Sequence, residues 1–129
     1  MARFLLDTDV IVEVLNQRPE ALALLRHLSS TDETVCVCTV VTAEIYSGLG
    51  ERQMPRALAL FSTSEYLPAS EEIAIQAGKW RYLYARRGIQ LSTTDMLIAA
   101  TAHAYNATIV TGNVRDYPMP EVSLLPLPR

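Results

Sequence analysis

The chain has 129 residues, 50% of them hydrophobic and 19% charged, which is enough apolar sequence for the core of one domain and excludes a largely disordered chain. Its apolar runs are too short to span a bilayer, and Asp7 and Asp9 interrupt the first of them, so we expect a cytoplasmic protein without a membrane segment or secretion signal. The net charge of −3 gives by itself no indication of nucleic-acid binding.

In the first half of the chain, short apolar runs alternate with segments of helical period. Proline marks the first turn of two of these helices, and glycine ends another. We predict, in chain order, a strand at residues 3–6, helices at 10–15 and 19–28, a polar loop at 29–34, a strand at 35–38, and helices from 40 to about 48–50 and at 55–61. Asp9 and Thr39 are the expected N-caps of the first and third of these helices.

The second half continues the alternation. We predict a strand at residues 66–68, helices at 73–87 and from 95 to about 105, strands at 107–111 and 122–125, and a loose tail at 126–129. Strands that alternate with helices predict a doubly wound α/β fold. The chain has no repeat, low-complexity segment or linker, so we predict a single domain over residues 1–129.

Four acidic residues lie at the ends of these predicted elements. Asp7 and Asp116 each follow a strand, whereas Glu44 and Asp95 fall in the first turns of helices. The carboxyl ends of parallel strands and the amino ends of the next helices share one edge of the sheet, where ligands bind. Carboxylates gathered there repel one another unless a cation lies between them, and Mg²⁺ or Mn²⁺ suits such oxygen ligands.

Each acid taken alone also has an ordinary structural explanation. Glu44 and Asp95 can favour the positive ends of helices, and Asp7 can cap a turn. A structural role of this kind predicts no correlation among the four positions, whereas all four fall on one edge, so we favour metal binding. Because Asp7 follows a strand, we expect it to make no helix-dipole interaction. The hydroxyls of Thr8 and Thr111 either end their strands or contact metal-bound water, and both interpretations stay open.

A basic segment with interleaved aromatic residues follows in the second half. Its cations and rings are Lys79, Trp80, Arg81, Tyr82, Tyr84, Arg86 and Arg87. Such a mixture suits a nucleic-acid phosphate backbone and its bases, although an amphipathic helix with a solvated basic face gives the same pattern. If a metal neutralises the four acids, ten acidic residues remain against 11 basic ones, so the acidic net charge does not exclude nucleic-acid binding.

The cysteines and histidines give no sign of a further site. Cys36 and Cys38 project from one face of a predicted strand and are expected to be buried apolar residues, since the chain has no other cysteine. His27 and His103 follow no metal-ligand spacing.

Four motifs resemble those of PIN-domain ribonucleases, in that family's order. They are LLDTDVI at residues 5–11, TVVTAE at 39–44, STTDMLIAA at 92–100 and TGNVRDY at 111–117. Length and compactness are most similar to the VapC-type toxins of bacterial toxin–antitoxin pairs. The resemblance implies a three-layer α/β/α sandwich around a mostly parallel five-stranded sheet, an endoribonuclease that depends on Mg²⁺ or Mn²⁺, a homodimer, and a VapB-like antitoxin partner.

The resemblance also implies a role for each acid. Asp7 and Asp95 would be the principal metal ligands, with Glu44 and Asp116 holding metal-bound water or a second ion. Two positions differ from the commonest pattern of the family. Asp9 is often Asn or Ser there, so it can be a ligand, a cap or a second-sphere group. Asn113 replaces a residue that is sometimes acidic.

Two other functions fit parts of the sequence. Asp7 and Asp9 also resemble the Asp-x-Asp loop of haloacid-dehalogenase-type phosphatases, but Lys79 is the only lysine and no late acidic pair follows. A catalytically inert PIN-like binding module is the non-enzymatic alternative. Assays with and without a chelator separate these hypotheses, because RNA cleavage, phosphate-monoester hydrolysis and inactivity are distinct outcomes.

Overall fold

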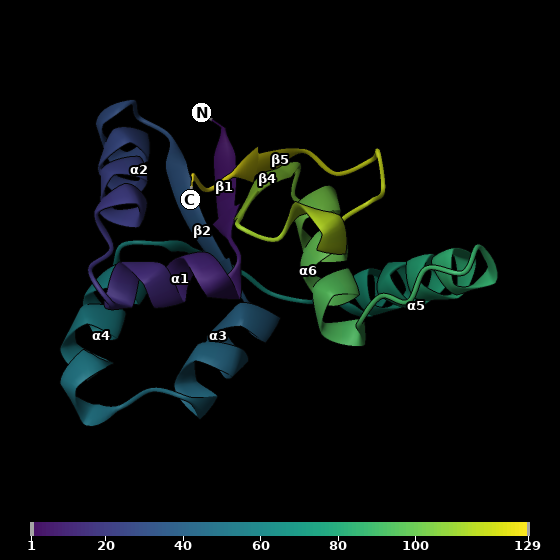
Figure 1. The fold of residues 1–129 in the computed structure, drawn as a ribbon, viewed down its shortest axis with the longest axis horizontal. Helices are drawn as coiled ribbons and strands as arrows, with labels where there is room; N and C mark the ends of the chain where they lie inside the picture. Colours follow the sequence, from purple (N-terminus) through teal and green to yellow (C-terminus); the bar gives the residue numbers. More distant parts are fainter. Residues whose placement is uncertain (1, 129) are drawn as a thin grey trace.

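The computed structural model describes residues 2–128. Figure 1 shows a central sheet with helices on both sides. The strands are β1 (Arg3–Leu6), β2 (Thr34–Cys38), β3 (Glu65–Leu67), β4 (Ala107–Thr111) and β5 (Leu124–Pro126). The α-helices are α1 (Thr8–Leu15), α2 (Pro19–Ser30), α3 (Thr39–Ser47), α4 (Met54–Ser62), α5 (Glu71–Arg86) and α6 (Thr93–Ala104). Two 3₁₀ helices, η1 (Glu51–Gln53) and η2 (Val114–Asp116), were not predicted.

The five strands pair in the order β3-β2-β1-β4-β5, and every pairing is parallel. The chain moves outward from β1 through β2 to β3, then crosses back to β4 and moves outward the other way to β5. The strand order therefore reverses between β1 and β4, which in an open α/β sheet is the place where ligands bind at the carboxyl ends of the strands.

The two directions of travel decide which face each helix covers. Parallel crossovers are right-handed, so the helices that lead from β1 to β3 lie on one face, and those that lead from β3 back to β4 lie on the other. Figure 1 agrees, with α1 to α4 gathered on one side and α5 and α6 together on the other. The predicted three-layer α/β/α fold is confirmed.

The central strands are buried on both faces, as expected of a parallel sheet covered by helices. Leu5, Cys36 and Ile109, on three adjacent strands, have no exposed surface, and Met96 and Ile98 of α6 pack into the same core. Cys36 is a buried core residue as predicted, and burial raises the pKa of its thiol to about 12, so it stays protonated at neutral pH. No helix within residues 2–128 is long and apolar enough to cross a membrane.

Both predicted N-caps are wrong. Helix α1 begins at Thr8, and its N-cap is Asp7, whose side chain accepts a hydrogen bond from the Thr8 amide. Helix α3 has Cys38 as its N-cap, so Thr39 is already helical. The Thr39 hydroxyl accepts a hydrogen bond from the Ala69 amide, which ties the start of α3 to the segment after β3.

Residues 126–128 of the predicted tail are ordered. Strand β5 lies at Leu124–Pro126 rather than 122–125. The Leu127 amide donates to the Thr111 carbonyl at 2.8 Å, which extends the pairing with β4, and the Leu127 side chain is 7% exposed. The tail prediction overlooked a leucine between two prolines that has a core position to fill. Arg129 lies outside the described residues.

We expect Leu127→Ala to lower the free energy of unfolding by about 2–3 kcal/mol, because it removes a buried side chain and leaves a cavity. Pro128→Ala, at an exposed neighbouring position, should change it by less than about 0.5 kcal/mol. Urea unfolding of both variants measures the difference. Equal stability of the two variants would show that the end of the chain contributes nothing to the core.

Candidate active site

The site begins where β1 and β4 end side by side. The Asp7 amide donates to the Val110 carbonyl at 2.9 Å, so Asp7 continues the pairing of these two strands before the chain turns into α1. Its carboxylate is only 5% exposed. Asp7 therefore lies at the reversal of the strand order, on the carboxyl edge of the sheet, and its buried charge requires hydrogen-bond donors.

Asp7 receives three such donors. Oδ1 accepts from the Thr8 amide at 2.8 Å. Oδ2 accepts from the Thr111 hydroxyl at 2.7 Å and from the Tyr117 hydroxyl at 2.9 Å. The position of Thr111 beside Asp7 follows from the pairing of β1 with β4. Tyr117 was not predicted as a site residue, and the only signal for it was the aromatic position directly after Asp116.

Glu44 is held toward Asp7 by the intervening Thr8. The Thr8 hydroxyl donates to Glu44 Oε1 at 2.6 Å. Glu44 is the sixth residue of α3, so it lies in the second turn of that helix rather than the first. It consequently gains little from the helix dipole, which acts within the first turn. The helix instead carries Glu44 along the rim to meet the start of α1.

Asp9 secures the turn that follows β4. Its Oδ2 accepts from the Gly112 amide at 2.9 Å and from the Asn113 side-chain amide at 3.2 Å. The Asn113 backbone amide in turn donates to the Thr111 hydroxyl at 2.9 Å. These bonds attach the turn to α1 and lead directly into η2, which ends at Asp116. Asp9 thus orders the segment that carries the fourth acid, and it is not a cap.

Asp95 lies in the first turn of α6, where the Ser92 side chain caps the helix and accepts from the Asp95 amide at 3.0 Å. Burial raises the pKa of Asp95 to about 6, the Ser92 hydrogen bond opposes this, and the negative charges of Asp116, Asp7 and Glu44 add to the rise. Burial and then the charge of Asp7 also raise the pKa of Asp116. The charges of the other three predicted acids therefore lie close enough to Asp95 to raise its pKa.

The donor set fits a hard divalent cation. Within residues 2–128, no three His, Cys, Asp or Glu side chains are already arranged around a common metal position. Mg²⁺ does not require such an arrangement, because it keeps several waters and binds proteins through one or two carboxylates. The charged groups that converge at the site are carboxylates, which suit Mg²⁺ or Mn²⁺ and differ from the His and Cys ligands typical of a zinc site.

The four basic residues predicted to bind RNA lie away from these acids. Lys79, Arg81 and Arg86 are exposed on α5, and Arg87 is its C-cap. Among the described residues, none of the four forms an ion pair with a site acid. The interleaved aromatic residues divide in two groups: Trp80 and Tyr84 are buried in the core, whereas Tyr82 is 64% exposed. The helix thus has both the core face and the basic outer face that were predicted.

The three arginines of this group contact neighbouring residues. The Arg81 Nε donates to the Leu91 carbonyl at 2.9 Å, which ties α5 to the segment before Ser92. The Arg86 guanidinium lies 5.4 Å from the centre of the Tyr82 ring, and that of Arg87 lies 5.3 Å from the Tyr84 ring. These contacts hold the cations in defined positions on the outer face of α5.

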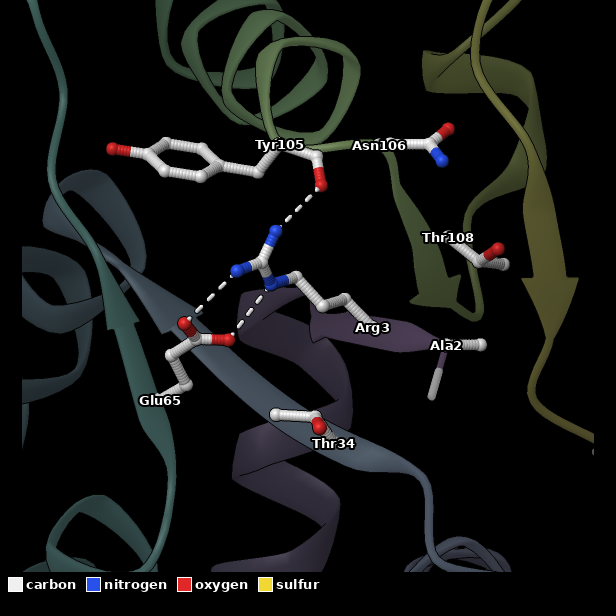
Figure 2. A pocket seen from close by; sticks show the side chains of 7 residues that line it. All are labelled: Ala2, Arg3, Thr34, Glu65, Tyr105, Asn106 and Thr108. Carbon is white, nitrogen blue, oxygen red and sulfur yellow. Dashed lines mark hydrogen bonds and ion pairs between the residues drawn. The ribbon is translucent and has the colours of Figure 1, made fainter.

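A cavity of about 720 Å³ lies at the opposite, amino edge of the sheet (Figure 2). The Arg3 guanidinium occupies it and bonds to both oxygens of Glu65, at 2.8 and 3.2 Å, and to the Tyr105 carbonyl at 3.1 Å. The cavity beside Thr8 and Glu44 is smaller, about 310 Å³. We locate the chemistry at the carboxyl edge in spite of this, because Arg3 and Glu65 already satisfy each other.

Comparison with known proteins agrees with this fold. The PIN domain family matches residues 4–118. The chain is 35% identical over 117 residues to ribonuclease VapC19 of Mycobacterium tuberculosis, with 89% of this chain and 92% of that protein covered. It is 27% identical over 122 residues to the tRNA(fMet)-specific endonuclease VapC of Salmonella typhimurium, with 91% of each covered.

Solved structures give the same result. A chain in the crystal structure of VapBC2 from Rickettsia felis, bound to a DNA fragment from their promoter, superimposes with a TM-score of 0.86 at 25% identity, covering 98% of this chain and 99% of that one. A chain of DNA-bound VapBC from Salmonella typhimurium has the same fold, with a TM-score of 0.82 at 24% identity over 99% and 100% of the two chains. The fold and site define an α/β protein with an acidic carboxyl edge. The chain belongs to the PIN domain family.

The raised pKa of Asp95 predicts how stability depends on pH. In metal-free protein, the unfolded chain loses this proton near the ordinary pKa of 3.8, whereas the folded chain keeps it until about 6. The folded state binds more protons between these values, so the free energy of unfolding should fall as pH rises from 4 to 6, by roughly 1 kcal/mol after solvent screening.

Thermal melts of metal-free protein across this pH range measure the effect. Asp95→Asn should remove most of the decline, while Glu71→Gln, which removes an acid from the first turn of α5, should leave it in place. A slope that Asp95→Asn does not change would contradict the raised pKa of Asp95.

Proposed function

We propose that this chain is a divalent-metal-dependent endoribonuclease that hydrolyses RNA phosphodiester bonds, and that it is the toxin of a VapBC-type toxin–antitoxin pair. The observation that carries the proposal is the convergence of Asp95, Asp116, Asp7 and Glu44 at the reversal point of the sheet. The activity in the names of its relatives supports the same reaction. We further propose that one domain performs it, in the cytoplasm.

The four acids would have two different roles in metal binding. Asp7 and Asp95 would bind the cation directly, and Glu44 and Asp116 would hold its waters or a second ion. When bound, Mg²⁺ or Mn²⁺ lowers the pKa of a coordinated water and offsets negative charge on the phosphate. Because Asp95 keeps its proton up to about pH 6 without metal, cation binding below that pH should release a proton.

The reaction needs no covalent intermediate. The oxygen of water would attack phosphorus in line with the leaving 3′ oxygen, and the P–O3′ bond would break. The departing oxygen takes a proton, so the products are a 5′-phosphate and a 3′-hydroxyl. The role of the protein in this step is to fix the carboxylates: Thr8 holds Glu44, and Asp9 holds the turn that precedes Asp116.

Four side chains would act indirectly through these bonds. Thr8 and Thr111 position the carboxylates of Glu44 and Asp7, and their hydroxyls are already engaged with them. Asp9 and Asn113 pair with each other across the turn after β4. We therefore assign all four to positioning the acids rather than to contact with RNA.

We propose that the outer face of α5 binds the RNA backbone through Lys79, Arg81, Arg86 and Arg87. The contact of Arg86 with exposed Tyr82 supports this, because an aromatic ring beside a cation can stack on a base while the cation meets a phosphate. α5 packs against α6, and α6 carries Asp95 in its first turn. A strand bound along α5 can therefore reach the acidic edge.

A VapB-like antitoxin and a second copy of the chain are the proposed protein partners. Complexes named VapBC among the similar structures support the antitoxin. The chain also exposes large apolar side chains on the helices that precede β3, which a partner would cover. These are Val12, Tyr46, Met54 and Leu58. A short neighbouring gene that encodes a DNA-binding protein would support the pairing.

The two alternatives differ in what the site residues must do. A haloacid-dehalogenase-type phosphatase needs Asp9 as a general acid, but Asp9 Oδ2 accepts from Gly112 and Asn113, and Lys79 is exposed on α5. An inert PIN-like module would bind RNA without cleaving it. RNA and a phosphate monoester, each tested with and without a chelator, separate the three functions.

Asp7→Asn and Asp95→Asn should each lower RNA cleavage by about 10³-fold, because each removes several kcal/mol of charge stabilisation. Asp32→Asn is the matched control: it makes the same change in an exposed turn between α2 and β2. Excess EDTA should stop wild-type cleavage, and Mg²⁺ or Mn²⁺ should restore it. Full wild-type cleavage in EDTA, freed of contaminating nuclease, would falsify the metal requirement.

Arg86→Gln with Arg87→Gln should weaken RNA binding and reduce its dependence on salt. For single-stranded RNA, each lost phosphate contact lowers the slope of log K against log salt by about 0.7. The matched pair Arg18→Gln with Arg26→Gln removes equal charge from the region of α2. Binding is measured in an Asp95→Asn background to prevent cleavage. Equal slopes for the two pairs would mean that α5 has only a solvated face.

A further inference from the structure

The buried Tyr117 hydroxyl shares one carboxylate oxygen with a second hydroxyl. Tyr117 is 2% exposed and Thr111 has no exposed surface. The two groups reach Asp7 Oδ2 at 2.9 and 2.7 Å. A carboxylate can only accept, so both hydroxyls donate. Burial and the nearby charge of Asp7 raise the pKa of Tyr117, so the phenol keeps its proton.

The Asp7 carboxylate has few acceptor positions left for a cation. An ionised carboxylate has about four acceptor positions, two on each oxygen. The two hydroxyls fill both positions on Oδ2. On Oδ1, the Thr8 amide takes one at 2.8 Å. One position is left, and it is on Oδ1.

Tyr117 is well placed to maintain this arrangement. Its backbone amide donates to the Val114 carbonyl at 3.2 Å across η2, directly after Asp116. A buried tyrosine has two side-chain torsions and a rigid ring, so its hydroxyl can hold a fixed direction. The hydroxyl therefore ties the position of one site acid to the orientation of another.

We propose that Tyr117 is a positioning residue that restricts Asp7 to binding a cation through Oδ1 alone and so favours Mg²⁺ over Ca²⁺. The inference rests on the proposed metal-dependent function. Ca²⁺ accepts carboxylates through one or both oxygens in loose geometry, whereas Mg²⁺ demands a compact octahedron. A carboxylate locked in one orientation with a single open position suits Mg²⁺ and withholds the two-oxygen mode from Ca²⁺.

Tyr117→Phe tests the proposal because it keeps the ring and removes the hydroxyl. Calorimetric titration of the full chain with Mg²⁺ and, separately, with Ca²⁺ gives the ratio of their dissociation constants. We expect Mg²⁺ to bind about tenfold more weakly, as for the loss of other groups that orient metal ligands, and Ca²⁺ to bind equally or more tightly. The preference for Mg²⁺ should therefore fall about tenfold or more.

Tyr105→Phe is the matched control, since it removes a hydroxyl that donates to the Pro68 carbonyl at 3.1 Å, away from the acids. Its ratio should equal that of wild type. Thr111→Val removes the other donor to Oδ2 and should lower the preference as well, while Thr111→Ser keeps a hydroxyl and should restore it. This second pair decides the question if Tyr117→Phe fails to fold.

The outcomes separate this inference from the function it rests on. If wild type binds both ions and neither Tyr117→Phe nor Thr111→Val changes their ratio, the positioning role is wrong and the metal site stands. If Tyr105→Phe lowers the ratio as much as Tyr117→Phe, the effect is a general loss of packing and the inference is also overturned. If wild type binds neither ion, the proposed metal function is overturned together with it.

Discussion

The buried carboxylate of Asp7 is the constraint on which the site depends. A charge removed from water must be hydrogen-bonded, and here the donors come from three parts of the chain: the start of α1, the end of β4 and the segment after η2. The parallel pairing of β1 with β4 brings these parts together. The same bonds therefore close the fold around the reversal point and fix the orientation of the acid.

The acids differ in the number of hydrogen bonds that stabilise their charges, and this difference decides which acid is destabilised most by the others. Asp7 has three hydrogen-bond donors, whereas the Asp95 carboxylate is supported by Ser92 and by the amino end of α6. Burial and repulsion from the other acids together raise the pKa of Asp95 to about 6. The expectation that Asp7 makes no helix-dipole interaction was wrong, because Asp7 is the N-cap of α1. Replacing its carboxylate by an amide would turn an acceptor of two hydroxyls into a partial donor. Relief of repulsion is therefore to be sought at Asp95, and the strain there accompanies the function.

The sequence was sufficient to predict the features that depend on local pattern. Apolar runs located all five strands, and the acids at their ends indicated the functional edge. It was insufficient where a partner is chosen by tertiary structure. Nothing local indicates that Tyr117 donates to a residue 110 positions earlier, or that Asp9 reaches across to Gly112. The turn of α3 that carries Glu44 was also misplaced, since even from the predicted start at residue 40 Glu44 would be the fifth residue and lie beyond the first turn.

The separation of cations from acids is consistent with the proposed RNA substrate. RNA is a polyanion, so an acidic site repels it until a metal is bound, and the attraction must come from elsewhere on the surface. Cations placed beside the acids would pair with them and occupy the position of the metal. On α5, the ring of Tyr82 instead holds Arg86 by its face, and Tyr84 holds Arg87, so no carboxylate is needed to orient either cation. The charges remain available to phosphate, so a protein of acidic net charge can still offer the basic face that the proposed RNA binding requires.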